Sequence, residues 1–210
     1  RAGLKRLFQT SQDVIPFTSS GTGAMEAAVV NTLSSGDTVL VLRAGKFGQR
    51  WEEICATYGI TVIPLEAPFG ETVAPEAFAR ALREHPEAKA VLMQHSESST
   101  GVLHDAKGIA AVTRSTGAIL IVDAVSSLGI ADLRMDEWGL DLVVSGSQKG
   151  LMLPPGLSFC ALSDKAWGHV KASRLPKYYF DVATERKFVA RNECRFTPAV
   201  SIFVGLREVL

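Results

Sequence analysis

Residues Ser145–Gly150 read Ser-Gly-Ser-Gln-Lys-Gly, and they follow directly on the apolar run Leu140–Val144. Such a run of aliphatic and β-branched residues is typical of a buried strand. In open α/β sheets, ligands bind at the carboxyl ends of the strands, and a lysine flanked by small residues lies at such an end here. This stretch therefore predicts both a class of fold and the place of a site within it.

The rest of the chain repeats this alternation of strand and helix patterns. Strand-like runs separated by helical segments predict an α/β fold, a mostly parallel sheet covered by helices on both faces. No linker or internal repeat divides the chain, so we expect one domain over residues 1–210. The predicted strands are Val14–Phe17, Thr38–Leu42, Thr61–Leu65, Lys89–Met93, Ala118–Val122, Leu140–Val144 and Leu157–Leu162, and the predicted helices cover residues 23–33, 48–58, 75–84, 105–116 and 128–137.

Local signals mark the ends of several elements. Gly36, Gly59 and Gly117 each follow a predicted helix, where glycine commonly closes the last turn. Ser163 is the predicted N-cap of a further helix. Residues 177–195 are rich in charged and aromatic side chains and give no clear prediction.

Charge and composition exclude several classes of protein. Lysine plus arginine number 22, as do aspartate plus glutamate, so no net charge attracts nucleic acid or an anionic membrane. No apolar run has the length of a membrane-spanning helix, and no signal peptide is evident. Cys55, Cys160 and Cys194 lie far apart without metal-ligand spacing, so we interpret them as reduced thiols of a cytoplasmic protein.

The sequence at each end of the chain has the pattern of a helix without a terminal cap. The chain opens on Arg1 without an initiator methionine, and residues 1–10 have a helical pattern. Residues 201–210 form an amphipathic pattern with no cap. We therefore expect a fragment of a longer protein.

The cluster Thr18–Gly23 follows the first predicted strand and opens a helix. Backbone N–H groups at a helix N-terminus, with hydroxyls beside them, form a seat for a phosphate. The cluster is not a Walker A loop, because no Gly-Lys-Ser/Thr follows, and Glu26 replaces the third glycine of a dinucleotide fingerprint. An ordinary capped turn is the alternative interpretation.

Three further polar groups follow predicted strands. A buried strand-end carboxylate such as Asp123 needs a cation or strong donors, which a protonated pyridine nitrogen or a structural ion pair would supply. Lys149 becomes a nucleophile if its surroundings lower its pKa, although most lysines are simply solvated. The cluster His95–Gly101 offers hydroxyls and one carboxylate, while His95 alone is more often structural.

Together these clusters resemble the class V aminotransferases of the fold-type-I pyridoxal-phosphate superfamily, in particular the bacterial alanine–glyoxylate and serine–pyruvate aminotransferase group. The resemblance covers essentially all 210 residues. It implies that the chain is the pyridoxal 5′-phosphate-binding large domain of a transaminase that moves an amino group from alanine or serine to glyoxylate or pyruvate. The most specific segments are Ser20–Ala28, Gly45–Gly48, His95–Gly101, Val122–Gly129, Ser145–Lys149, Pro154–Gly156 and Thr197–Val200.

The resemblance also implies the roles of the residues around the cofactor ring. Lys149 would form the Schiff base and then shuttle a proton. Asp123 would pair with the pyridinium nitrogen. Val125 would pack on one face of the ring and Phe47 on the other, and Ser98 would lie near the phenolic oxygen.

The phosphate would be held by residues from two subunits. Thr197 matches a residue that reaches the phosphate of a neighbouring subunit, which implies a homodimer. Phe196 replaces a tyrosine that many bacterial relatives carry, so one hydroxyl is lost beside that contact. The other residues implied in holding the phosphate, all from the same chain, are Ser20, Gly21, Thr22 and Gln148.

Parts of the family pattern are expected to lie outside this chain. The arginine that binds the substrate carboxylate belongs to a C-terminal small domain beyond Leu210, and an N-terminal segment that covers the substrate is also absent. The chain is therefore expected to hold the cofactor determinants without a complete substrate site.

Other readings remain open at this point. A cysteine desulfurase typically has histidine before the lysine, where this chain has Gln148. Phosphoserine aminotransferases share the Gln-Lys pair, but their flanking segments match less well. A catalytically incomplete dimerisation or binding module and a nucleotide-binding Rossmann protein are the alternatives from other classes.

Overall fold

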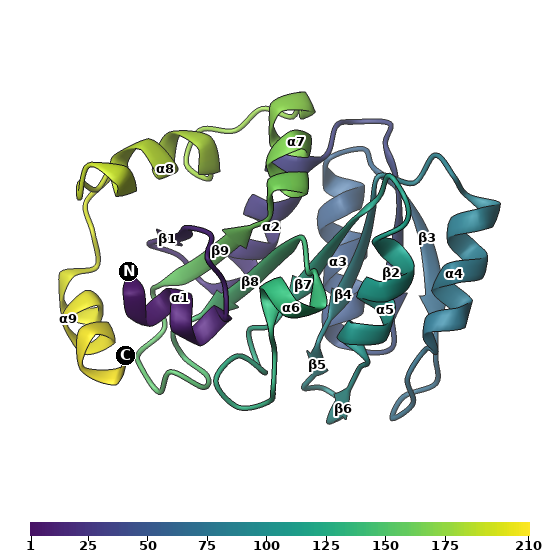
Figure 1. The fold of residues 1–210 in the computed structure, drawn as a ribbon, viewed down its shortest axis with the longest axis horizontal. Helices are drawn as coiled ribbons and strands as arrows, with labels where there is room; N and C mark the ends of the chain where they lie inside the picture. Colours follow the sequence, from purple (N-terminus) through teal and green to yellow (C-terminus); the bar gives the residue numbers. More distant parts are fainter.

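The computed structural model describes residues 1–210. A seven-stranded sheet runs through the middle of the molecule and helices cover both of its faces, while β5 and β6 form a separate small hairpin (Figure 1). The predicted α/β class is confirmed. The strands are β1 (Val14–Phe17), β2 (Thr38–Arg43), β3 (Thr61–Glu66), β4 (Ala90–Gln94), β5 (Ser96–Glu97), β6 (Val102–Leu103), β7 (Ile119–Asp123), β8 (Leu142–Gly146) and β9 (Ser158–Leu162), and the helices are α1 (Ala2–Phe8), α2 (Gly21–Thr32), α3 (Lys46–Thr57), α4 (Pro75–Glu84), α5 (Ala106–Thr113), α6 (Met135–Trp138), α7 (Asp164–Ala172), α8 (Val182–Ala190) and α9 (Val200–Val209).

The sheet order is β1-β9-β8-β7-β4-β2-β3. Strands β3, β2, β4, β7 and β8 pair in parallel, and β9 is antiparallel to both of its neighbours. The register aligns Gln94 of β4 with Asp123 of β7, and Asp123 with Val144 of β8. The carboxyl ends of the three central strands therefore lie side by side, where the polar clusters begin.

Two hydrophobic clusters form the core, one on each face of the sheet. Alternate residues of β2 divide between them, with Leu40 and Leu42 in one cluster and Val39 and Val41 in the other. The first cluster includes residues of α1, α4, α5, α6 and α9, and the second includes residues of α2, α3, α7 and α8. Because both faces are covered, the central strands are apolar throughout, as the sequence indicates.

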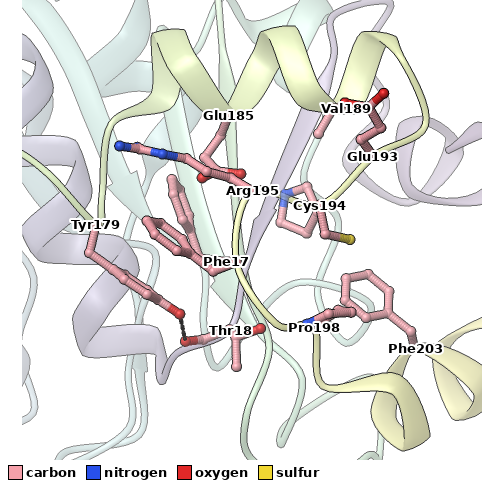
Figure 2. Close-up of a pocket in the computed structure, with 12 residues that line it drawn as sticks. Phe17, Thr18, Tyr179, Glu185, Val189, Glu193, Cys194, Arg195, Pro198 and Phe203 are labelled. Atoms are coloured by element: carbon pink, nitrogen blue, oxygen red, sulfur yellow. Dashed lines mark hydrogen bonds between the residues drawn. The ribbon is translucent and has the colours of Figure 1, made fainter.

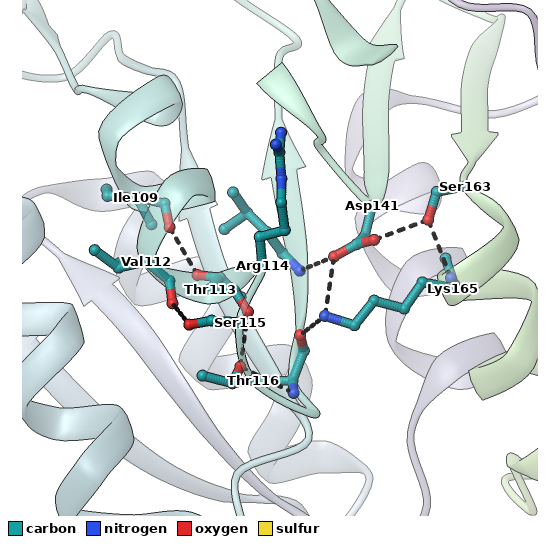
Figure 3. Close-up of polar contacts among 12 residues, drawn as sticks. Ile109, Val112, Thr113, Arg114, Ser115, Thr116, Asp141, Ser163 and Lys165 are labelled. Atoms are coloured by element: carbon teal, nitrogen blue, oxygen red, sulfur yellow. Dashed lines mark hydrogen bonds and ion pairs between the residues drawn. The ribbon is translucent and has the colours of Figure 1, made fainter. Parts of the chain in front are cut away.

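A polar network ties the opposite, amino-terminal ends of the strands together (Figure 3). Asp141 is 7% exposed and accepts hydrogen bonds from the Leu120 backbone N–H at 3.0 Å and the Ser163 hydroxyl at 2.8 Å. Lys165 Nζ lies 3.8 Å from the same carboxylate and donates to the carbonyl of Ala118. The network joins β7, β8 and the start of α7 at the edge of the sheet farthest from the polar clusters.

Most element boundaries agree with the sequence within a few residues, but two local predictions are wrong. Of the predicted helix 128–137 only residues 135–137 are helical, within α6 (Met135–Trp138), because Gly129 has a φ of +79° in the preceding turn. Gly36 and Gly59 are left-handed as expected, with φ of +86° and +68°, whereas Gly117 is not, since α5 already ends at Thr113.

The remaining local signals have clear outcomes. Ser163 caps α7 as predicted, its hydroxyl accepting from the Ala166 N–H at 3.1 Å. The uninterpreted stretch 177–195 contains α8, and the Asp181 carboxylate accepts from the N–H groups of Ala183 and Thr184 at its start. No helix has both the length and the apolar character that a membrane crossing requires.

Candidate active site

The polar clusters meet in one cavity at the carboxyl ends of β7 and β8. Its volume is about 220 Å³, and it is open to solvent. Of the residues predicted for the site, all except Ser98 and Thr197 line it. The full lining is Ser20, Gly21, Thr22, Met25, Phe47, Arg50, Ser96, Asp123, Val125, Ser126, Gln148 and Lys149.

The N-terminus of α2 forms one end of the cavity. Ser20 precedes the helix, and its hydroxyl does not cap the first turn, so those N–H groups are left free of a side-chain acceptor. Gly21 is required by close packing, because a Cβ there would lie 2.7 Å from Cγ2 of Val125. Free N–H groups at the positive end of a twelve-residue helix suit a phosphate.

The Gln148 side chain contributes to the same end of the cavity. Its Oε1 is buried and has no hydrogen-bond partner in the protein. A buried amide without a partner is uncommon and costs free energy unless a ligand or water satisfies it. Because the amide is not engaged elsewhere, rotation can turn its N–H groups toward an anion.

Asp123 lies at the last position of β7 and is 5% exposed. Its Oδ1 accepts one hydrogen bond, from the Val125 N–H at 2.8 Å. Burial is the main reason that the pKa of Asp123 is raised to about 6. The Val125 hydrogen bond and the positive charges of Arg50 and Lys149 oppose the rise, and the charge of Glu97 adds to it. A carboxylate that is buried with a single donor is prepared for a cationic partner.

Lys149 follows β8 on a loop and its side chain is exposed beside the cavity. The loop is held from below by the buried Ser147, whose hydroxyl donates to the Pro154 carbonyl at 2.7 Å and accepts from the Leu157 N–H at 3.2 Å. The Met152 N–H closes the turn on the Lys149 carbonyl at 2.8 Å. The backbone is thus fixed while the amine is left accessible to a ligand.

Phe47 is positioned by a carboxylate from another element. The N-cap Gly45 provides no side chain, and instead Glu97 Oε2 accepts from the N–H groups of Phe47 at 3.0 Å and Gly48 at 3.2 Å. Glu97 is fully buried, and its Oε1 accepts from the hydroxyl of Ser99 at 2.6 Å. Glu97 therefore caps α3 across the sheet edge and fixes the aromatic ring in the cavity wall.

Two of the predicted residues lie outside the cavity. Ser98 is exposed in the turn after β5, and Ser96 lines the cavity in its place. Thr197 is exposed and belongs to the segment before α9, next to Phe196. Neither residue is part of the lining that the other predicted residues share.

The segment before α9 is nonetheless attached to the start of the α2 loop. Phe196 stacks on Tyr179 with ring centroids 4.7 Å apart and planes inclined by 11°. The Tyr179 hydroxyl donates to the Thr18 carbonyl at 3.1 Å, as the dashed line in Figure 2 shows. Phe196 therefore packs against a residue of its own chain.

Sequence reasoning missed several cavity residues. Met25, Arg50 and Ser126 lie close in the chain to predicted residues, and the helical spacing of three from Phe47 to Arg50 was the only available signal for the arginine. The capping role of Glu97 had no signal at all, because its partners lie about fifty residues earlier in the chain.

The chain matches the family described as aminotransferase class-V over residues 1–210. The chain belongs to this family. The cofactor of class-V aminotransferases is pyridoxal 5′-phosphate. The mostly parallel sheet agrees with the fold that the resemblance implies.

Individual relatives carry different names. The chain is 48% identical to a protein named soluble hydrogenase, small subunit, from Synechococcus sp. (strain PCC 6716), covering 100% of this chain and 55% of that protein. It is 44% identical to the L-aspartate–glyoxylate aminotransferase of Paracoccus denitrificans, covering 97% of this chain and 53% of the relative. The chain thus spans about half the length of the curated relatives it matches.

A solved structure agrees in fold. The alanine–glyoxylate aminotransferase of Nostoc sp. superposes with a TM-score of 0.94 at 32% identity, over 99% of this chain and 56% of that one. The cavity of the class-V chain also fits the family cofactor chemically. It offers N–H groups without a side-chain acceptor at the start of α2, an amide in Gln148 with a buried unpartnered oxygen, an acid in Asp123 and an amine in Lys149.

Replacing Asp123 by asparagine should stabilise the cofactor-free protein at high pH. The folded pKa is raised from 3.8 to about 6, so the protonated form is favoured on folding, and that stability is lost as the pH rises through 6. Asp123→Asn should therefore raise the free energy of unfolding at pH 8 by up to about 3 kcal/mol, with little gain near pH 4. Thermal unfolding at several pH values measures the difference.

The exposed variant Asp132→Asn is the control for this measurement. A gain for Asp123→Asn that is equally large at pH 4 and pH 8 would mean that the carboxylate charge is not what costs stability.

Replacing Glu97 by alanine should weaken cofactor binding through Phe47. Two N–H groups of α3 would lose their acceptor, at a cost of about 1–3 kcal/mol of folding stability, and the ring would no longer be fixed. Glu97→Gln keeps one acceptor oxygen and should fall between wild type and Glu97→Ala. Titration with pyridoxal phosphate and denaturation in urea measure the two effects.

Glu53→Ala, at an exposed position of the same helix, is the matched control. Equal affinity for pyridoxal phosphate in Glu97→Ala and Glu53→Ala would show that the cap does not position Phe47.

Proposed function

We propose that this chain is the cofactor-binding part of a transaminase in which Lys149 bonds covalently to pyridoxal phosphate. The observation that carries this proposal is the meeting of Lys149, Asp123 and the N-terminus of α2 in one cavity. Taken singly, none of the three groups identifies a ligand. Together they match the three chemically distinct parts of the cofactor: Lys149 matches its aldehyde, Asp123 its ring nitrogen and the start of α2 its phosphate.

The chain would bind the phosphate with neutral donors at the start of α2. The N–H groups of Gly21 and Thr22, the hydroxyl of Ser20 and the amide of Gln148 all lie at that end of the cavity. These groups would fix the cofactor without any covalent chemistry. Val125 and Phe47 would then enclose the ring from its two faces.

Asp123 would keep the ring nitrogen protonated. Its buried carboxylate has a single protein donor, the Val125 N–H, so one oxygen remains for the cation. When bound, pyridoxal phosphate supplies an electron sink that stabilises negative charge at the Cα of an amino acid. A buried, charged Asp123 strengthens that sink because its low-dielectric surroundings enhance the ion pair.

Lys149 would act twice. Its amine would first condense with the aldehyde, with the aldehyde oxygen leaving as water, and the exposed position of the side chain leaves room for that carbon. Once a substrate amine has displaced it, the freed Lys149 amine would accept the proton from the substrate Cα. The fixed backbone around Ser147 would keep the amine on the correct side of the ring.

Small amino acids and 2-oxo acids are the proposed substrates, with alanine or serine as donor and glyoxylate or pyruvate as acceptor. The names of the Paracoccus and Nostoc relatives support glyoxylate as an acceptor. We infer that the arginine for the substrate carboxylate lies outside residues 1–210. We also propose a homodimer in which Thr197 reaches the neighbouring site, which is consistent with its exposed position away from the cavity of its own chain.

The covalent bond to Lys149 is tested by absorbance. The full-length protein mixed with pyridoxal phosphate should show a visible band that borohydride reduction makes permanent, and Lys149→Ala should lack it. Lys107→Ala, at an exposed lysine of α5, should retain the band. A Lys149→Ala protein that still becomes covalently labelled on reduction would place the bond elsewhere.

The amino donor is tested on the same full-length protein. Adding L-alanine or L-serine should bleach the visible band, and glyoxylate or pyruvate should restore it, because a transaminase returns its cofactor to the starting form. Bleaching by L-cysteine alone, with release of sulfide, would replace the transaminase proposal with a desulfurase.

A further inference from the structure

Arg50 projects from α3 into the cofactor cavity beside Phe47. The two side chains are three residues apart on the same helix, so they share a face, and both line the cavity with Lys149. Arg50 is half-buried there. Its guanidinium carbon lies 4.9 Å from the centroid of the Phe47 ring, within the range of a cation–π contact.

Arg50 also contacts the phosphate end of the cavity. Its Nη1 donates to the Thr22 hydroxyl oxygen at 3.2 Å. A hydroxyl has one proton to donate and two lone pairs, and this contact occupies a lone pair. The Thr22 proton is therefore left to be donated to another acceptor, which at the N-terminus of α2 would be an anion.

The charge of Arg50 has no counter-ion in the protein. Every ion pair in residues 1–210 involves other cations, such as Arg43 with Glu52 and Lys165 with Asp141. The only acid that lines the cavity is Asp123, and no carboxylate oxygen lies within 4.0 Å of the guanidinium. A half-buried cation without a partner is a place for a bound anion.

The covalent chemistry of the site increases the need for this charge. Lys149 and Arg50 are the only basic side chains in the cavity lining. Under the proposed function, Lys149 is used to bond the aldehyde, and the donors at the start of α2 are neutral. Arg50 is then the single permanent positive charge available in this chain to balance a phosphate that carries nearly two negative charges.

We propose that Arg50 is a phosphate-binding residue of this site, which neutralises the cofactor phosphate and orients the Thr22 hydroxyl as a donor toward it. The proposal rests on the proposed function, because it takes pyridoxal phosphate as the ligand. Guanidinium groups form charge-assisted hydrogen bonds with phosphate that are stronger than those of neutral donors. Arg50 therefore discriminates between phosphorylated and unphosphorylated forms of the cofactor.

Comparing pyridoxal phosphate with pyridoxal isolates this role, since the two differ only in the phosphate. The measurement is the dissociation constant of each for the full-length protein, from fluorescence and absorbance titrations. Arg50→Gln should weaken pyridoxal phosphate binding by roughly 10- to 100-fold, as expected for loss of a charged hydrogen bond, and should change pyridoxal binding by less than about 3-fold. Arg50→Lys should recover part of the lost affinity, because lysine keeps the positive charge but cannot donate two parallel hydrogen bonds as a guanidinium does.

Arg80→Gln is the matched control, since it removes the same charge from an exposed position of α4. Inorganic phosphate should compete with pyridoxal phosphate for wild type and for Arg80→Gln, and less effectively for Arg50→Gln. Circular dichroism on each variant checks that the fold is retained.

Two results would overturn the proposal. Equal weakening of pyridoxal and pyridoxal phosphate would show that Arg50 acts only by supporting Phe47, and no change in either would show that it does not act at the site. These results are distinct from failure of the proposed function. The affinities for pyridoxal phosphate and pyridoxal can still be compared in Lys149→Ala, where the covalent bond cannot form. A wild-type protein that binds both ligands with equal affinity would refute the Arg50 assignment even if the Lys149 bond is intact.

Discussion

The parallel pairing of β4, β7 and β8 is the constraint on which the site depends. It aligns three strand ends at one edge and forces Asp123 to be buried between its neighbours. A carboxylate in that position is unfavourable in the protein alone, as its raised pKa indicates. The fold therefore carries a local cost that protonation relieves and that a bound cation would offset.

The fold class and the strand-end groups of the cavity could be predicted from the sequence for one physical reason, whereas Phe47, Val125 and Gln148 were expected only from the family resemblance. Buried parallel strands must be continuously apolar, and so the polar residues directly after them stand out, as Asp123 and Lys149 do. The start of a helix could also be predicted where the capping residue lies next to it in the sequence, as Ser163 does. The helix predicted over residues 128–137 failed because a left-handed glycine interrupts an apolar pattern that packs as a turn.

What could not be predicted depends on contacts between distant segments. Glu97 caps a helix about fifty residues earlier in the chain, and the sequence of neither segment predicts this contact. The contact from Arg50 to Thr22 likewise crosses from one helix to another. The expected position of Ser98 shows the limit of carrying a role over by motif, since a two-residue hairpin strand turns Ser96 toward the cavity and leaves Ser98 in the exposed turn. The cross-subunit role of Thr197 stays a prediction.

The division of the core by the sheet has a consequence for how this site tolerates change. Both helices that line the cavity, α2 and α3, pack into the cluster on one face, while α4, α5 and α6 pack into the other. Substitutions on the two faces share few direct contacts, and distant substitutions without shared partners combine additively. Changes within α4 and α5 are therefore expected to combine additively with changes within α2 and α3, because the sheet lies between the two sets of helices.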